Sequence, residues 1–357
     1  MTRLLRAALL GFLLTLALGL LARSHPPVPG TFSFPSPAKL LDMKLGTAHQ
    51  PFVRRQLVPS ILRSVDAVTS EQFRSAITGH LEASKLIHPF LFDASEGESF
   101  DSFICLIVWF VCFTVFAWAF ETEAAVYARL SNPGSGPFRG LAIVYTVAAC
   151  LMLIPLLHNN YIYDPPTVCF SILTLRALRR ERFFELVLLT ILFSFNRETA
   201  FLIPGLTFFT WVHRQRYGTA VQQAAILSAL YFAIACSLAF HYHHNLGSLA
   251  ENNRAYLVHT YIHKNAKYAV AAILSLAAYT YAVVRCWTSL PPVLKAVQWF
   301  VPLWIFMHIM WGWPMEWRVF LEVYPGMLLT IIACWGILRP AIGSSARQPS
   351  AATLAAT

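Results

Sequence analysis

The chain consists largely of apolar runs of about 15–20 residues, close to the length that crosses a bilayer as a helix, separated by short polar stretches. Hydrophobic residues make up 57% of the chain and charged residues only 12%, whereas soluble domains carry about 25% charged residues. An ordinary soluble globule is therefore excluded, and so is a disordered chain, which would need low hydrophobicity and high charge. We expect an all-α, polytopic helical membrane protein.

About ten segments are expected to cross the bilayer fully or in part. The first lies within residues 1–23, and the others are residues 102–120, 138–157, 165–178, 183–195, 199–212, 220–240, 267–284, 295–312 and 323–338. The segments 165–178, 183–195 and 199–212 fall short of the roughly 20 residues that a straight span needs. Short segments are tolerated where they are buried in protein or line a wet cavity.

These segments divide the chain into four parts. Residues 1–23 are expected to form a first transmembrane helix or signal anchor, with an uncleaved helix favoured over a signal peptide. Residues 24–101 form an external polar segment, in which Arg54–Val68 and Ser70–Lys85 are predicted amphipathic helices. In the first of these helices, Val58, Ile61, Leu62 and Val65 share one face. Residues 102–340 form the multi-pass domain, and 341–357 a disordered cytoplasmic tail.

The basic residues indicate which side of the membrane each loop faces. With the N-terminus in the cytoplasm, fourteen Lys and Arg residues fall in cytoplasmic positions and five in short external loops, as the positive-inside rule requires. Both termini are then cytoplasmic, in what we expect to be a bacterial inner (plasma) membrane. The net charge of +10 reflects this anchoring, so we expect the bilayer and not nucleic acid as partner. Residues 183–212 are assigned as a hairpin, although a single long helix is an alternative.

Unusual polar residues gather on the external side in this topology. Tyr163 and Asp164 precede Pro165 and Pro166 at the start of a span, where a carboxylate meets the positive end of the helix dipole. Asp164 is thus either a helix cap or a catalytic or substrate-binding carboxylate. Arg197 and Glu198 lie between two apolar halves, where charges are costly and are usually paired or functional. They either neutralise each other or contribute to a site, with Arg197 as a phosphate ligand.

Further candidates precede the last span and follow residues 220–240. Arg318 and Glu322 are four residues apart and can share a helix face, so Glu316, Arg318 and Glu322 form either an interfacial anchor or an arginine held by two carboxylates. His243 belongs to an external polar loop that either contacts phosphate or is merely solvated. Metal-ligand spacing is absent, and the seven cysteines form no CxxC pair. We therefore expect neither a metal nor a cofactor.

Three of these stretches resemble a known group. Tyr163-Asp164-x-Pro166, Asn196-Arg197-Glu198-Thr199 and Glu316-x-Arg318-x-x-x-Glu322-x-x-Pro325 resemble motifs of bacterial multi-pass membrane proteins with GT-C glycosyltransferase-like architecture. The segment Phe52–Pro59 is also similar to one that follows their first helix. The chain departs from GT-C enzymes because its first external segment has no Asp-Asp or Asp-Glu pair just after the first helix.

The resemblance implies an integral membrane glycosyltransferase that uses a polyprenyl-phosphate-linked sugar on the external face. Asp164 and Glu198 would then be catalytic carboxylates, with Glu316 and Asp42 as rivals. The substrate-binding residues would be Tyr163, Arg197, His243, Glu316, Arg318 and Glu322. The alternatives are a transporter or flippase for an anionic or lipid-linked substrate, and a non-catalytic membrane subunit whose ion pairs only hold helices together.

Overall fold

A computed structural model describes residues 2–24, 40–48, 52–85, 87, 99–130, 138–156, 162–245, 266–311 and 320–344. Every regular element in these ranges is helical and none is a strand, which confirms the all-α class. The helices that precede α5 in the chain are α1 (Arg3–Ser24), α2 (Leu40–Leu45), η1 (Phe52–Arg54), α3 (Leu57–Val68) and α4 (Glu71–Ala83). The helices that follow are α5 (Ser99–Leu130), α6 (Phe138–Leu156), α7 (Asp164–Arg179), α8 (Phe183–Asn196), η3 (Glu198–Phe201), α9 (Leu202–His213), α10 (Tyr217–His241), α12 (Ala266–Cys286), η5 (Trp287–Ser289), α13 (Pro292–Trp311) and α14 (Tyr324–Ser344).

Each of the ten apolar runs corresponds to a helix, because an apolar run of this kind satisfies its backbone polar groups internally only as a helix. Three helices in the described ranges are long and apolar enough to cross a membrane, and these are α1, α5 and α10. Shorter apolar helices lie at Gly140–Ile154, Phe183–Asn196, Pro292–Phe306 and Tyr324–Leu338. The larger number of about ten spans stays a prediction.

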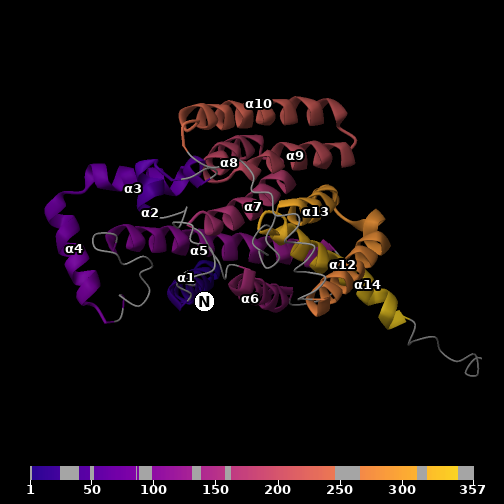
Figure 1. The fold of residues 1–357 in the computed structure, drawn as a ribbon. Helices are drawn as coiled ribbons and strands as arrows, with labels where there is room; N and C mark the ends of the chain where they lie inside the picture. The colour runs from indigo at the N-terminus through magenta and orange to yellow at the C-terminus, as the bar shows by residue number, and fades with distance from the viewer. Residues whose placement is uncertain are drawn as a thin grey trace, which may run out of the picture.

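Helix α5 runs through the middle of the molecule and packs against α1, α6, α7 and α14 (Figure 1). Its buried face carries Trp109, Phe113, Phe116 and Phe120. The helix continues beyond its apolar run to Leu130, and the carboxylates of Glu121 and Glu123 are buried in this extension. Glu121 accepts a hydrogen bond from Arg6 at 2.6 Å, and Glu123 pairs with Arg179.

Both ion pairs lie at one end of the bundle. They bring the start of α1 and the end of α7 to the end of α5. The loop between α9 and α10 joins them, because Arg214 Nη2 donates to the carbonyl of Arg179 at 3.4 Å. Arg6, Arg179 and Arg214, three of the arginines that the count assigns to the cytoplasmic side, therefore lie together at one end of the described structure.

Helices α3 and α4 of the polar segment pack against the opposite end, where Figure 1 shows them at the left beside the start of α5. Val58 and Leu62 of the predicted amphipathic face are buried. They belong to a small apolar cluster that also includes Val53, Cys105 and Tyr163. Helix α4 begins where Ser70 Oγ accepts from the Phe73 amide at 3.3 Å, as an N-cap serine does. This small cluster places the polar segment against the start of α7.

Candidate functional site

The chain reverses direction at Arg197, between α8 and α9. The Arg197 backbone is extended (φ −160°, ψ 146°) and ends α8. Glu181, just before α8, pairs with Arg214, just after α9, at 2.6 Å. Two helices of these lengths in one continuous line would hold those residues roughly 45 Å apart. Residues 183–212 therefore form a hairpin, and Arg197 lies at its turn.

Arg197 is paired with two carboxylates, one at the start of α7 and one in the turn just before α14. Its Nη1 lies 2.9 Å from Glu322 Oε1 and 3.8 Å from Asp164 Oδ1. All three residues are buried, with exposed fractions of 7% for Arg197, 3% for Glu322 and 0% for Asp164. A buried arginine needs such partners because an unpaired charge in an apolar interior is strongly unfavourable. The structure thus brings together three of the predicted site residues from separate parts of the chain.

Glu322 is fixed by two further donors. Thr199 Oγ1 donates to Glu322 Oε1 at 2.8 Å, and Trp304 Nε1 donates to Oε2 at 3.3 Å. Hydrogen bonds to an ionised acceptor are stronger than those between neutral groups. The Glu322 carboxylate, just before α14, therefore accepts hydrogen bonds from both the hairpin turn and α13.

Asp164 opens α7, with Pro165 and Pro166 in the first turn, where proline needs no amide hydrogen bond. This start of α7 is held against the end of α8. Asn196 Nδ2 donates to the Tyr163 carbonyl at 3.0 Å and to Thr167 Oγ1 at 2.9 Å. The Asp164 carboxylate lies at the positive end of the α7 dipole and beside Arg197, so both its position and its neighbour favour a negative charge.

Arg55 is a member of the site that sequence reasoning missed. Its Nε lies 3.2 Å from Glu198 Oε2, and its Cζ lies 4.1 Å from the centre of the Tyr163 ring. Arg197 approaches the same ring at 5.9 Å. Two guanidinium groups, the Glu198 carboxylate and the Tyr163 ring therefore meet where the polar segment contacts the bundle. The only signal in the sequence was Arg54-Arg55 in the Phe52–Pro59 stretch.

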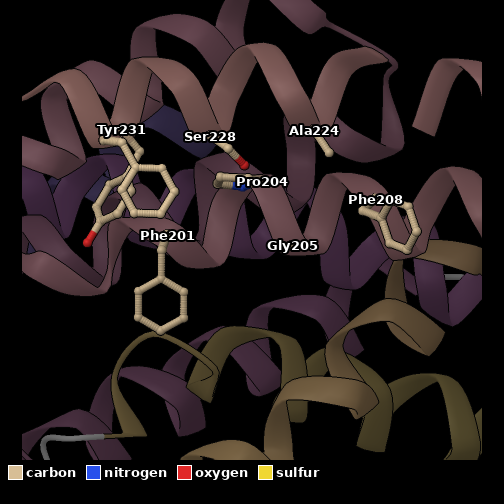
Figure 2. A pocket seen from close by; sticks show the side chains of 8 residues that line it. Phe201, Pro204, Gly205, Phe208, Ala224, Ser228 and Tyr231 are labelled. Carbon is tan, nitrogen blue, oxygen red and sulfur yellow. The ribbon is translucent and has the colours of Figure 1, made fainter. Parts of the chain in front are cut away.

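An apolar groove of about 370 Å³ lies between α9 and α10 (Figure 2). Its walls include Phe201, Pro204, Phe208, Ala224 and Tyr231. The Tyr231 hydroxyl donates to the Glu198 carbonyl at 2.8 Å. The Phe201 ring lies 5.9 Å from that of Trp304, the donor to Glu322. Two residues of the groove wall therefore contact the polar cluster directly.

The remaining candidates do not join the cluster in the described residues. His243 lies exposed in the turn after α10, with its ring against Phe240 and His244. Asp42 lies in α2, where its carboxylate accepts from Thr47 at 3.5 Å. Glu316 and Arg318 lie outside the described residues. The described part of the site thus comprises Arg55, Tyr163, Asp164, Arg197, Glu198, Thr199, Trp304 and Glu322, which we call the arginine–carboxylate cluster.

The arrangement suits an amphipathic substrate with an anionic head. Two arginines provide planar donor groups that match phosphate oxygens. The apolar groove beside them has room for part of a hydrocarbon chain. In comparisons with known proteins, no family model, curated sequence or solved structure matches the chain.

Proposed function

We propose that the chain is a polytopic membrane protein that transfers a sugar from a polyprenyl-phosphate donor on the external face of a bacterial inner membrane. The observation that carries this proposal is the arginine–carboxylate cluster beside an apolar groove, whose wall residue Tyr231 donates to the Glu198 carbonyl. A lipid-linked sugar has a tail that needs an apolar surface and a phosphate that needs cationic donors. The cluster and the groove offer both within one site.

The membrane placement is supported by the helices and by the charges. Helices α1, α5 and α10 have the length and hydropathy of spans. The end of the bundle that contains Arg6, Arg179 and Arg214 has the arginine excess of a cytoplasmic surface. The arginine–carboxylate cluster then faces the external side, and both termini are cytoplasmic.

Glu198 is the carboxylate best suited to accept a proton. Its side chain is 36% exposed, whereas Asp164 and Glu322 are buried against Arg197. A general base has to reach the proton that it removes, and a buried carboxylate already paired with Arg197 meets this requirement less well. Glu198 is therefore our catalytic base, while Asp164 and Glu322 position Arg197.

The proposed reaction replaces one bond at the anomeric carbon of the sugar by another. The acceptor hydroxyl oxygen forms a bond to the anomeric carbon, and its proton passes to Glu198. The bond between the anomeric carbon and the phosphate oxygen breaks, and its electron pair leaves with polyprenyl phosphate. Arg197 and Arg55 stabilise the charge that develops on this leaving group. Glu316, Arg318 and His243 remain candidate substrate contacts at the same face.

The test uses the protein in lipid nanodiscs with a panel of polyprenyl-phosphate donors that carry radiolabelled sugars, and membranes of the expressing cells as acceptors. We expect one donor to be converted to polyprenyl phosphate, and Glu198→Gln to reduce the rate at least about 100-fold, as loss of a general base does. Glu181→Gln is the control, because Glu181 is also an exposed glutamate in an arginine pair, at the other end of the bundle. Full transfer by Glu198→Gln would contradict the proposal.

A transporter or flippase is the second candidate, because the chain is interrupted at Arg197 between two short apolar helices, as in transporters with broken helices. The same labelled donors separate the two functions in sealed vesicles. Movement of the intact donor across the bilayer without loss of its sugar would favour transport and count against transfer.

A further inference from the structure

The Arg55–Glu198 ion pair lies at the accessible edge of the arginine–carboxylate cluster. The two side chains differ in exposure, with 11% of Arg55 and 36% of Glu198 accessible. By contrast, Arg197 and its two carboxylates are almost fully buried. An incoming ligand therefore meets the Arg55–Glu198 pair before it meets the inner pair.

Arg55 is held in place by contacts that do not depend on Glu198. Its guanidinium carbon lies 4.1 Å from the centre of the Tyr163 ring, a distance at which a cation is attracted to the ring face. Its backbone follows η1, where Val53 is buried in the small apolar cluster. Lys44 also holds the polar segment in place, because its Nζ lies 2.7 Å from the buried Asp101 carboxylate. Arg55 thus keeps its position if Glu198 moves.

The backbone of Glu198 is held more firmly than its side chain. Its backbone is fixed, because its carbonyl accepts from the Tyr231 hydroxyl. Its carboxylate pairs with Arg55 Nε, at 3.2 Å for one oxygen and 3.4 Å for the other, and in the described part of the chain no other side chain pairs with it. A rotation of the Glu198 side chain is therefore enough to vacate the position beside Arg55.

We propose that Arg55 is an anion-binding residue at which a phosphate or pyrophosphate group exchanges with the Glu198 carboxylate. The exchange replaces one anion by another, so the guanidinium stays neutralised and no buried charge is left unpaired. Phosphate oxygens form the same charge-assisted hydrogen bonds as the carboxylate that they displace. Arg55 would therefore bind the ligand and release Glu198 in one step.

This inference rests on the proposed function and deepens it. While Glu198 is paired with Arg55, its carboxylate is not available to accept a proton. Once the donor phosphate binds Arg55, the Glu198 carboxylate can accept the proton of an acceptor hydroxyl. The base thus becomes available only when donor is bound, which couples donor recognition to proton transfer.

The first experiment measures the accessibility of Glu198 directly. The protein in nanodiscs is treated with a water-soluble carbodiimide and an amine, and modified carboxylates are located by peptide mass spectrometry. The probes are pyrophosphate alone and nanodiscs that contain polyprenyl phosphate. We expect either probe to increase modification of Glu198 by at least about threefold while that of Glu181 stays constant, since release of an ion pair worth roughly 1 kcal/mol changes populations by this order.

The two probes distinguish the source of the anion. A response to pyrophosphate alone means that the anionic group is sufficient, whereas a response restricted to polyprenyl phosphate means that the lipid chain is required. Both results support the exchange. Unchanged or decreased modification of Glu198 with both probes overturns it.

The second experiment measures the affinity for whichever probe binds. Arg55→Ala should weaken binding about tenfold or more, the equivalent of one charge-assisted hydrogen bond, and Arg55→Lys should retain part of it. Glu198→Gln should strengthen binding several-fold, because the competing carboxylate is gone. A purely structural ion pair predicts no strengthening in Glu198→Gln, and that result would also overturn the proposal.

Arg74→Ala is the matched control. Arg74 belongs to the same polar segment, pairs with Asp66 and approaches the Phe100 ring at 5.6 Å, but among the described residues it does not contact the arginine–carboxylate cluster. Neither readout requires sugar transfer. A chain that binds the anion and releases Glu198 without transferring sugar would contradict the proposed function alone, whereas transfer with unchanged Glu198 modification would overturn the exchange alone.

Discussion

Arg197 Nη1 lies 2.9 Å from Glu322 Oε1, which joins the turn of the α8–α9 hairpin to the start of α14. Asp164 approaches the same guanidinium from the start of α7. Charges that are scattered along an apolar sequence thus converge, because each needs a partner of opposite sign in an apolar interior. The convergence is the structural basis of the candidate site.

Replacement of Arg197 by alanine should destabilise the protein severely. The substitution leaves the buried carboxylates of Asp164 and Glu322 without their shared cation, and removal of one partner of a buried ion pair costs about 3–5 kcal/mol. The measurement is thermal unfolding in detergent, followed by tryptophan fluorescence. Arg180→Ala is the control, since Arg180 is exposed beyond the end of α7. Equal unfolding temperatures for both variants would show that the buried pair contributes nothing.

Replacement of Lys44 by methionine should loosen the polar segment. Lys44 is buried between the carboxylates of Asp66 and Asp101, and of the described residues Arg74 alone would remain to neutralise them. We expect protease cleavage within residues 40–85 to become at least about tenfold faster, as a loss of 1.4 kcal/mol or more in local stability requires. Lys85→Met, at an exposed position, should cleave at the wild-type rate. Unchanged cleavage in Lys44→Met would contradict a clamping role.

The sequence predicted the helices well because hydrophobic length is a local property. It also pointed to Asp164, Arg197 and Glu322, since a charged residue in apolar surroundings stands out without any knowledge of the fold. The ends of α5 were less predictable, because Glu121 and Glu123 are tolerated in a buried helix only through arginines from α1 and α7.

Arg55 could not be found in the same way. It lies in a polar segment where charged residues are common, so its charge carries no signal. Its position in the site depends on how Val53 and Val58 pack against the start of α5 and of α7, which is tertiary information. His243 is the opposite case, a residue that the sequence suggested for the site but that lies exposed in a turn. A polar residue next to apolar helices can therefore stand out in the sequence without joining the cluster.

Gly11 should be required for the close packing of α1 on α5. A Cβ atom at Gly11 would lie 2.7 Å from the backbone nitrogen of Thr114, so Gly11→Ala should force the helices apart and cost about 1–3 kcal/mol. A Cβ at Gly79 in α4 meets no atom within 4 Å, and Gly79→Ala should stabilise the protein by about 1 kcal/mol. Unfolding of both variants in detergent tests these opposite signs, and a stabilised Gly11→Ala variant would contradict the packing.

The two ends of the bundle should face opposite sides of the membrane. Cysteines introduced one at a time at Arg180 and His243, after replacement of the exposed Cys236, can be tested with a membrane-impermeant maleimide. The arginine distribution predicts that spheroplasts label His243→Cys directly and Arg180→Cys only after permeabilisation. The reverse pattern would place the arginine–carboxylate cluster in the cytoplasm and contradict external transfer.

A bulky side chain in the groove between α9 and α10 should impair use of the lipid donor without affecting the carboxylates. Ala224 lines the groove, so Ala224→Phe should fill part of the space and raise the KM for the lipid donor about tenfold, the equivalent of losing about 1.4 kcal/mol of apolar contact. kcat should change little, since the bound tail interacts equally in the ground and transition states. Val221→Phe is the control, because Val221 lies on the same helix with 61% of its surface exposed. A kcat effect without a KM effect would mean that the groove does not hold the tail.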